Sequence, residues 1–322
     1  MSEREIIGEI SRRFQKTTSR SRHLVCGIGD DCAVFRQQAG SDWLISTDML
    51  VENIHFDLSF HPPYKLGRKI VAVNLSDIAA MGGLPEFMLI SVSLPKYIGR
   101  SWLADLLAGI DDMSAGFGCQ LIGGDTVGGG ELSFSVTVIG KTDGITPIYR
   151  YGAKAGDRVY ITGSLGQSGA GLEILRGGLQ ADDPELAEKL IEAHLNPEPQ
   201  IKTGRMLAER ALATAMQDVS DGITTDLAHI CSASKVGAVI YEHLLPGREQ
   251  LERICAGTNF SALDLMIAAG EDYQLVFTSP SRRLAENTAE ITRIGEVVCG
   301  SGVRLVRLNG TEEDIAWRGF EH

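Results

Sequence analysis

The spacing of apolar residues predicts helices and strands that alternate irregularly along the whole chain. Apolar side chains recur at helical spacing over 64–81 and 102–117, and an amphipathic first helix is expected over 3–15. Short apolar runs bounded by Gly, Asp and Ser predict strands, which we expect at 33–37, 43–48, 87–94, 120–123, 132–139 and 158–162. Both halves of the chain therefore read as mixed α and β structure.

The length of the chain indicates two domains. At about 100 to 200 residues per domain, 322 residues are enough for two separate cores. The segment 141–147 carries turn-forming residues and no apolar periodicity, which is typical of a boundary. We expect an N-terminal domain over residues 1–147 and a C-terminal domain over residues 148–322.

Composition excludes several classes of protein. The chain has 30 Lys and Arg against 42 Asp and Glu, a net charge of −12, so it offers no broad basic surface for nucleic acid. It has no run of about 18 apolar residues that would span a membrane. Its six cysteines contain no CxxC pair and read as reduced thiols. We expect a cytoplasmic protein that binds neither nucleic acid nor membrane.

Short acidic motifs are the strongest chemical signal in the sequence. In six places an acidic residue is flanked by Gly, Ser or Thr, and these places are 27–31, 46–48, 74–77, 123–126, 218–222 and 270–273. Oxygen ligands of this kind suit hard cations such as magnesium. Turn and helix-cap chemistry explains any one of the motifs alone. The six together favour a metal site.

Two aspartates have surroundings that sharpen this expectation. Asp77 lies inside the apolar helical stretch 70–81, where a carboxylate is costly unless it is paired or bound to metal. A cationic side chain or a helix cap elsewhere in the fold is the alternative explanation. Asp48 follows Ser46 and Thr47 at the end of an apolar strand, where ligands often meet a sheet.

Two glycine-containing segments do not match the common nucleotide-binding motifs. Residues 140–142 resemble the end of a Walker A loop, but Ser135 stands where that motif requires Gly. The turn 163–171 follows a strand and precedes a helix, yet it lacks the GxGxxG spacing. A tight turn with close helix packing and a contact to phosphate both remain open for this segment.

Taken in order, the six acidic motifs closely resemble those of the thiamine-monophosphate kinase family, and the match extends over nearly the whole chain. This family belongs to the superfamily of aminoimidazole ribonucleotide synthetase and selenophosphate synthetase. The resemblance implies a two-domain α/β fold like that of aminoimidazole ribonucleotide synthetase, whose N-terminal sheet forms a barrel-like homodimer interface. It also implies ATP-dependent phosphorylation of thiamine monophosphate to thiamine diphosphate by direct in-line transfer.

The resemblance also implies a role for individual residues. As ligands of several Mg²⁺ ions it implies Asp30, Ser46, Thr47, Asp48, Asp77, Asp125, Asp218 and Asp221. ATP would be bound by Gly124, Asp125, Arg150 and Ser220, and thiamine monophosphate by His55, Glu271 and Trp317. Because the second pKa of a phosphate ester is about 6, the acceptor is largely ionised at neutral pH, and we assign no general base.

Some positions depart from the usual family pattern, and two other functions stay open. Asn53 stands where Gly is usual, and Tyr151 follows Arg150 where a small residue is frequent. The first alternative is an ATP-dependent enzyme like aminoimidazole ribonucleotide synthetase, which shares the fold and the acidic sites. The second is a binder of nucleotide or thiamine phosphate that has no turnover.

Overall fold

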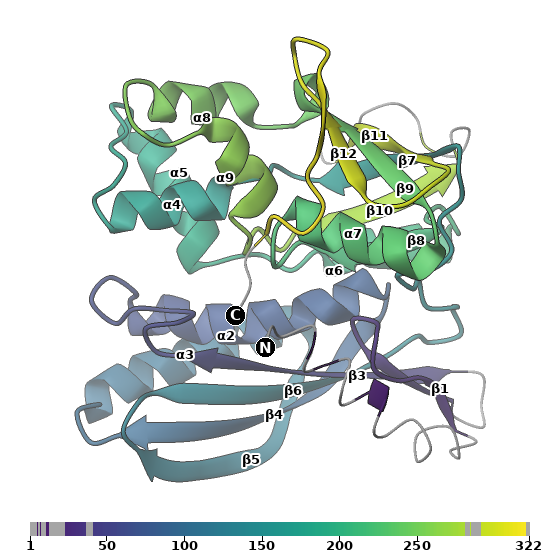
Figure 1. The fold of residues 1–322 in the computed structure, drawn as a ribbon. Helices are drawn as coiled ribbons and strands as arrows, with labels where there is room; N and C mark the ends of the chain where they lie inside the picture. Colours follow the sequence, from purple (N-terminus) through teal and green to yellow (C-terminus); the bar gives the residue numbers. More distant parts are fainter. Residues whose placement is uncertain are drawn as a thin grey trace.

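The computed structural model describes residues 23–36, 41–280 and 291–319, together with Glu5, Ile7, Ser11, Arg12 and Leu284. Of the helix predicted over 3–15, these first four positions have helical conformation, and the rest of that helix lies outside the described residues. The described chain has two halves, each with its own sheet (Figure 1).

The N-terminal half contains a six-stranded sheet in the order β1-β2-β3-β6-β4-β5. The β4–β5 pair is parallel and the other neighbouring strands are antiparallel. Helices α2 (Pro63–Ala80) and α3 (Arg100–Phe117) pack against each other, and α2 lies on one face of the sheet (Figure 1). The strands are β1 (Leu24–Cys26), β2 (Ala33–Arg36), β3 (Asp42–Val51), β4 (Leu84–Pro95), β5 (Gln120–Gly129) and β6 (Ser133–Lys141).

Alternation along β6 shows which face of this sheet is covered. Phe134, Val136 and Val138 are buried, whereas the residues between them are partly exposed. Because successive side chains of a strand point to opposite faces, the first set faces α2 and the second faces away from it. Among the described residues, helices therefore cover only one face of this sheet.

The C-terminal half contains a seven-stranded sheet in the order β13-β12-β9-β11-β7-β10-β8. Its strands are β7 (Asp157–Thr162), β8 (Ala215–Asp218), β9 (Gly237–Tyr241), β10 (Leu275–Pro280), β11 (Ile291–Val298), β12 (Val303–Val306) and β13 (Glu312–Asp314). Its helices are α4 (Gln167–Leu175), α5 (Pro184–Leu195), α6 (Ile201–Glu209), α7 (Ile223–Ser234), α8 (Arg248–Cys255) and α9 (Ala262–Ala268), with the 3₁₀ turn η1 (Glu242–Leu244).

The two halves meet along α2. Helix α6 packs on α2 so closely that a Cβ at Gly204 would lie 2.1 Å from the carbonyl oxygen of Ala79. The apolar core around α2 continues into the C-terminal half through Tyr160 and Phe277. Helix α2 is thus an element of the N-terminal half that both halves help to bury.

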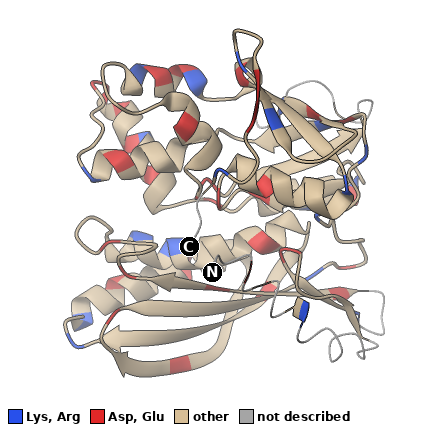
Figure 2. Ribbon diagram, in the orientation of Figure 1, with Lys and Arg blue, Asp and Glu red and all other residues tan. Residues whose placement is uncertain are grey.

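The mixed α/β prediction is confirmed, and the barrel is absent from the single described chain. The six-stranded sheet is open, with β1 and β5 as its edge strands. Each sheet is built from one side of residue 147, but the predicted domain limits themselves stay a prediction. Figure 2 shows acidic and basic residues interspersed along the helices of both halves. Among the described residues, no helix has the length and apolar character needed to cross a membrane.

Candidate active site

Three carboxylates from distant parts of the chain meet where the two halves join. Asp31 lies between β1 and β2, Asp77 lies on α2, and Asp218 ends β8. Each offers one oxygen, and these oxygens all lie within 4.8 Å of one another. We call these three residues the carboxylate cluster.

The cluster favours bound protons or a cation over three free negative charges. Burial, followed by the nearby carboxylates of Asp48 and Asp218, raises the pKa of Asp77 well above its usual range. Burial and the neighbouring Asp31 raise the pKa of Asp218 to about 7. The same two causes raise the pKa of Asp30 to about 7.

The described residues supply only part of the compensating charge. The guanidinium of Arg150 donates to Asp31 Oδ1 from Nη2 at 2.6 Å and from Nε at 3.1 Å. The backbone N–H of Arg150 donates to Asp30 Oδ2 at 3.1 Å, and the hydroxyl of Ser46 donates to Asp77. The other oxygen of Asp31, Oδ2, is buried and has no hydrogen-bond partner among the described residues. An all-oxygen donor set with an unused buried oxygen fits a hard divalent cation.

Most of the predicted metal ligands gather here. Ser46 and Asp48 lie on the face of β3 that carries the buried Leu44 and Leu50, so both point toward α2. Asp221 follows Asp218 in the loop between β8 and α7, and its charge contributes to the raised pKa of the buried Asp226 after the effect of burial.

Two predicted metal ligands do not reach the carboxylate cluster. The side chain of Thr47 lies on the opposite face of β3, where its hydroxyl donates to the carbonyl of Val136 at 3.0 Å and lies 3.1 Å from Thr137 Oγ1. Asp125 is exposed on β5, three strands from β3 in the sheet. At about 4.8 Å per strand this separation is about 14 Å.

The structure explains why glycine occupies position 124 and what the turn 163–171 contacts. At Gly124, φ is 155° and an added Cβ would lie 1.8 Å from the carbonyl of Ile90. In the turn 163–171, the carboxylate of Asp272 accepts from the N–H of Gly166 at 2.6 Å and of Ser168 at 3.1 Å. The chain's own carboxylate therefore occupies the start of α4, which favours the tight-turn interpretation over a contact to phosphate.

The loop 270–273 carries the predicted substrate contact Glu271. It is hydrogen-bonded to the loop 219–222, which follows Asp218 of the carboxylate cluster. The N–H of Glu271 donates to the carbonyl of Ser220 at 2.7 Å, and the N–H of Tyr273 donates to that of Val219 at 2.8 Å. Glu271 also forms an ion pair with Lys69 of α2, with Nζ 3.2 Å from Oε1. Ser220, the predicted nucleotide contact, thus lies directly beside Glu271.

The other two predicted substrate contacts, His55 and Trp317, lie at turns of the chain. The ring of His55 accepts a hydrogen bond at Nδ1 from the N–H of Val51 at 3.0 Å. Trp317 has φ of 64° and packs against His229 of α7, with ring centroids 5.0 Å apart. Two residues later, the N–H of Gly319 donates to the hydroxyl of Thr225 at 3.0 Å, so the segment follows α7.

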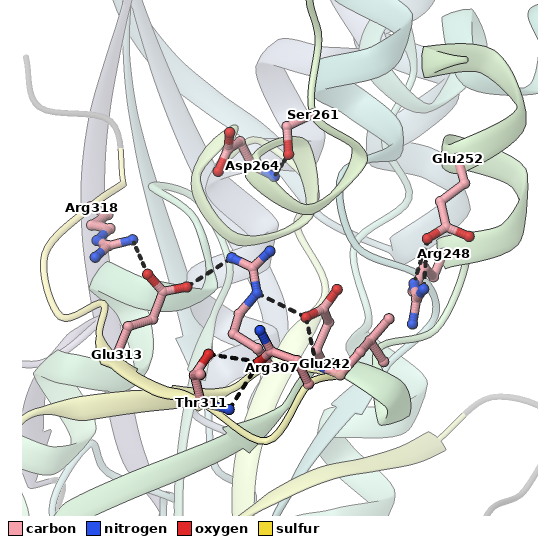
Figure 3. Close-up of polar contacts among 11 residues, drawn as sticks. Glu242, Arg248, Glu252, Ser261, Asp264, Arg307, Thr311, Glu313 and Arg318 are labelled. Atoms are coloured by element: carbon pink, nitrogen blue, oxygen red, sulfur yellow. Dashed lines mark hydrogen bonds and ion pairs between the residues drawn. The ribbon is translucent and has the colours of Figure 1, made fainter.

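A charged network holds the hairpin that leads to Trp317 (Figure 3). Arg307 donates to Glu242 at 2.9 Å and to Glu313 at 2.8 Å, and Arg318 reaches the other oxygen of Glu313 at 3.5 Å. The network ties the segment after β12 to η1, and it fixes the path of the chain on both sides of the tryptophan.

Three comparisons with known proteins agree with this arrangement. The family model of the AIR synthase related protein N-terminal domain matches residues 29–142, and that of the C-terminal domain matches residues 154–307. The thiamine-monophosphate kinase of Escherichia coli strain K12 is 37% identical over 321 residues, which cover 97% of this chain and 96% of the relative. That of Bacillus subtilis strain 168 is 35% identical over 335 residues, 100% and 99% of the two chains.

Two solved structures resemble the chain over all or most of its length. A structure of AaThiL complexed with AMPPCP and TMP superposes with a TM-score of 0.87 at 31% identity, covering 100% of this chain and 97% of the other. A thiamine-monophosphate kinase from Stenotrophomonas maltophilia K279a gives a TM-score of 0.75 at 32% identity, covering 91% and 94%.

Proposed function

The chain belongs to the thiamine-monophosphate kinases of the AIR synthase related family, and we propose that it transfers the γ-phosphoryl group of ATP in line to the phosphate of thiamine monophosphate. The products are thiamine diphosphate and ADP. The carboxylate cluster carries this proposal, because two phosphate-bearing substrates can meet at three buried carboxylates only if cations screen their charges.

Magnesium is the cation that this donor set suits. Bound Mg²⁺ supplies Lewis-acid chemistry by withdrawing charge from phosphate oxygens. The residues that would hold several such ions are Asp30, Ser46, Asp48, Asp77, Asp218 and Asp221. Asp31, which lies in the motif 27–31 but was not among the predicted ligands, joins them. The unused buried oxygen of Asp31 supports its inclusion.

The remaining residues bind and orient the two substrates. Arg150 brings a guanidinium to the edge of the cluster, where it can contact a polyphosphate, and Ser220 lies in the adjoining loop. Glu271, His55 and Trp317 would contact the organic part of thiamine monophosphate. The acceptor oxygen is already ionised at neutral pH, so the chain needs no side chain to remove a proton from it.

Phosphorus NMR tests the reaction directly. Purified protein is incubated with MgCl₂, ATP and thiamine monophosphate, beside a reaction without the acceptor. We expect thiamine diphosphate and ADP in the complete reaction, none with Asp48→Ala, and undiminished product with Asp105→Ala, which removes an exposed carboxylate from α3.

Two negative results would point to the two alternatives. If the folded wild-type protein bound ATP but made no diphosphate, the kinase assignment would fail, and turnover with the substrate of aminoimidazole ribonucleotide synthetase would identify that activity instead. Binding of both ATP and thiamine monophosphate without any turnover would identify a non-catalytic binder.

We also propose that the protein acts as a homodimer in which sheet edges of two copies pair. In the described register, β2 pairs with β3 at residues 42–45, whereas β6 pairs with β3 as far as residue 51. Strand β5 is an edge strand, and all ten of its residues are exposed. Unpaired strand edges readily pair with another chain. In each copy, strands β3, β6, β4 and β5 form the part of the sheet between these two edges. Pairing β5 of one copy with residues 46–51 of the other would close the two four-strand parts into a barrel.

This pairing explains the position of Asp125. Thr47 and Asp125 both lie on the face of the sheet that points away from α2. In the dimer, the partner's Asp125 would lie beside Thr47, which adjoins Asp48 in sequence although the two side chains point to opposite faces of β3. The two predicted ligands that the single chain separates by about 14 Å would then serve one site made from two copies.

Mixed dimers test the shared site. Asp48→Ala and Asp125→Ala are each expected to abolish activity. After co-expression, about half of the dimers are mixed, and each mixed dimer holds one intact site, so activity should return to about a quarter of wild type. Absence of any recovery, with mixed dimers isolated by two affinity tags, would show that both residues serve the site of their own chain.

A further inference from the structure

Lys69 is a fully buried cation whose ion-pair partner is Glu271. It lies near the start of α2, its side chain has no exposed surface, and its Nζ is 3.2 Å from Oε1 and 3.3 Å from Oε2 of Glu271. A buried ammonium group is costly unless a carboxylate pairs with it. Contact with both oxygens of the partner fixes the plane and direction of that carboxylate as well as its charge.

His194 completes the surroundings of the carboxylate without adding charge. Its Nδ1 lies 3.4 Å from Glu271 Oε2 and 3.1 Å from the hydroxyl of Ser168. Burial, and then the charge of Lys69, lower the pKa of His194 to about 2, so its ring is neutral at neutral pH. The positive charge that balances Glu271 therefore comes from Lys69.

The backbone of Glu271 is also held in an uncommon conformation. Its φ is 55°, in the left-handed region that non-glycine residues rarely adopt, and the hydrogen bond from its N–H to Ser220 helps to keep it there. Its side chain nevertheless stays 27% exposed, whereas that of Lys69 is fully buried. One side of a firmly held carboxylate thus remains open to a ligand.

We propose that Lys69 is a positioning residue that holds Glu271 toward the cationic, amino-bearing organic end of the phosphate acceptor. This inference rests on the proposed function. Asp77 lies eight residues after Lys69 on the same helix, which is about 12 Å along its axis. Helix α2 thereby sets the separation between the phosphoryl-transfer centre and Glu271, and this separation selects acceptors of the right length.

Steady-state kinetics of Lys69→Met test this role. Met has a similar length but no charge, so Glu271 loses its counter-ion while the cluster at Asp77 keeps its residues. We expect KM for thiamine monophosphate to rise about tenfold or more and KM for ATP to change less than about twofold. Equal rises in KM for thiamine monophosphate and in KM for ATP would show a general disturbance of the fold and would overturn the proposal.

Lys65→Met is the matched control. Lys65 lies one turn earlier on α2 and forms an ion pair with Glu192 of α5, outside the proposed site. The same chemical change there removes a cross-helix ion pair and is expected to lower thermal stability without raising KM for thiamine monophosphate. A rise in that KM as large as the one for Lys69→Met would refute a specific role for Lys69.

A double-mutant cycle tests whether Lys69 acts through Glu271. If it does, the loss in kcat/KM for Glu271→Gln should change less than about twofold when Lys69→Met is added, because the carboxylate to be positioned is already absent. Losses that multiply in the double variant would show that Lys69 acts independently of Glu271, and the proposal would be wrong.

A binding measurement separates this inference from the proposed reaction. The rise in melting temperature given by thiamine monophosphate with MgCl₂ needs no turnover, and it should shrink in Lys69→Met while the rise given by ATP with MgCl₂ persists. Lys69→Gln, which keeps a polar donor, takes the place of Lys69→Met if that variant does not fold. A wild type that binds both ligands without turnover would refute the kinase but leave this binding test decisive.

Discussion

The carboxylates at the join of the two halves should make the metal-free protein less stable as the pH rises. Burial raises the pKa of both Asp30 and Asp218 to about 7, with the nearby Asp31 as the second cause. In the unfolded chain these groups have ordinary pKa values of about 3.9. The folded state therefore holds more protons than the unfolded state between about pH 4 and pH 7.

The size of the effect follows from this difference. About three pKa units at about 1.4 kcal/mol per unit give about 4 kcal/mol for one carboxylate taken alone. Because the folded-state pKa is raised, this contribution to stability is fully present below about pH 4 and is lost as the pH rises through about 7. Magnesium binds the deprotonated form, so it should restore stability at about pH 8 and have little effect at about pH 5.5.

Thermal unfolding with EDTA or MgCl₂ at these two pH values is the assay. We expect the metal-free protein to melt at a lower temperature at the higher pH, and MgCl₂ to raise the melting temperature mainly there. Asp218→Asn should reduce both effects, whereas Asp105→Asn, an exposed change on α3, should alter neither. A metal-free melting temperature that is unchanged or higher at the higher pH, or equal stabilisation by MgCl₂ at both, would refute the reasoning.

Three further changes have outcomes that the contacts define. An added Cβ at Gly109 would lie 1.9 Å from a backbone oxygen of α2, so Gly109→Ala should lower the free energy of unfolding by about 2 kcal/mol in urea titrations, while Gly116→Ala, with open space on the same helix, should not lower it. Ser46→Ala removes a donor to the carboxylate cluster and should raise the MgCl₂ concentration for half-maximal activity about tenfold. Arg307→Met leaves Glu242, itself 7% exposed, without its counter-ion and should cost about 2 kcal/mol by the same titration.

The elements that the sequence predicts best are those whose pattern is local. The helices expected at 64–81 and 102–117 match α2 and α3 within two residues at either end, because long amphipathic stretches carry a strong periodic signal. The strand expected at 120–123 continues to Gly129. Glycines have low strand propensity, so the pairing of this segment with β4, a tertiary contact, decides its length.

The candidate site likewise contains residues that a local pattern predicts and residues whose partners only the fold reveals. Asp77 could be predicted because a carboxylate on an apolar helix is conspicuous by itself. The pairing of Asp31 with Arg150 and of Lys69 with Glu271 could not, since the partners are 119 and 202 residues apart in sequence. Lys69 is a charged residue at the start of the same apolar stretch, eight positions before Asp77, and that position was the available signal for it. Only the fold shows what Lys69 contacts.

Helix α2 explains why a site assembled from such distant segments can be fixed in place. It carries Lys69 and Asp77, and the glycines that face it allow neighbouring backbones to approach closely, as at Gly204 of α6. Strand β8 also contacts α2, and residues of α6, β7 and β10 belong to the same apolar core, so the elements that adjoin the loops after β8 and before β10 pack around the helix that carries Asp77. A bulky side chain at Gly204 would therefore push α6 away from α2. The packing around α2 that stabilises the fold thus also sets the distance between the proposed substrate end and the metal end of the site.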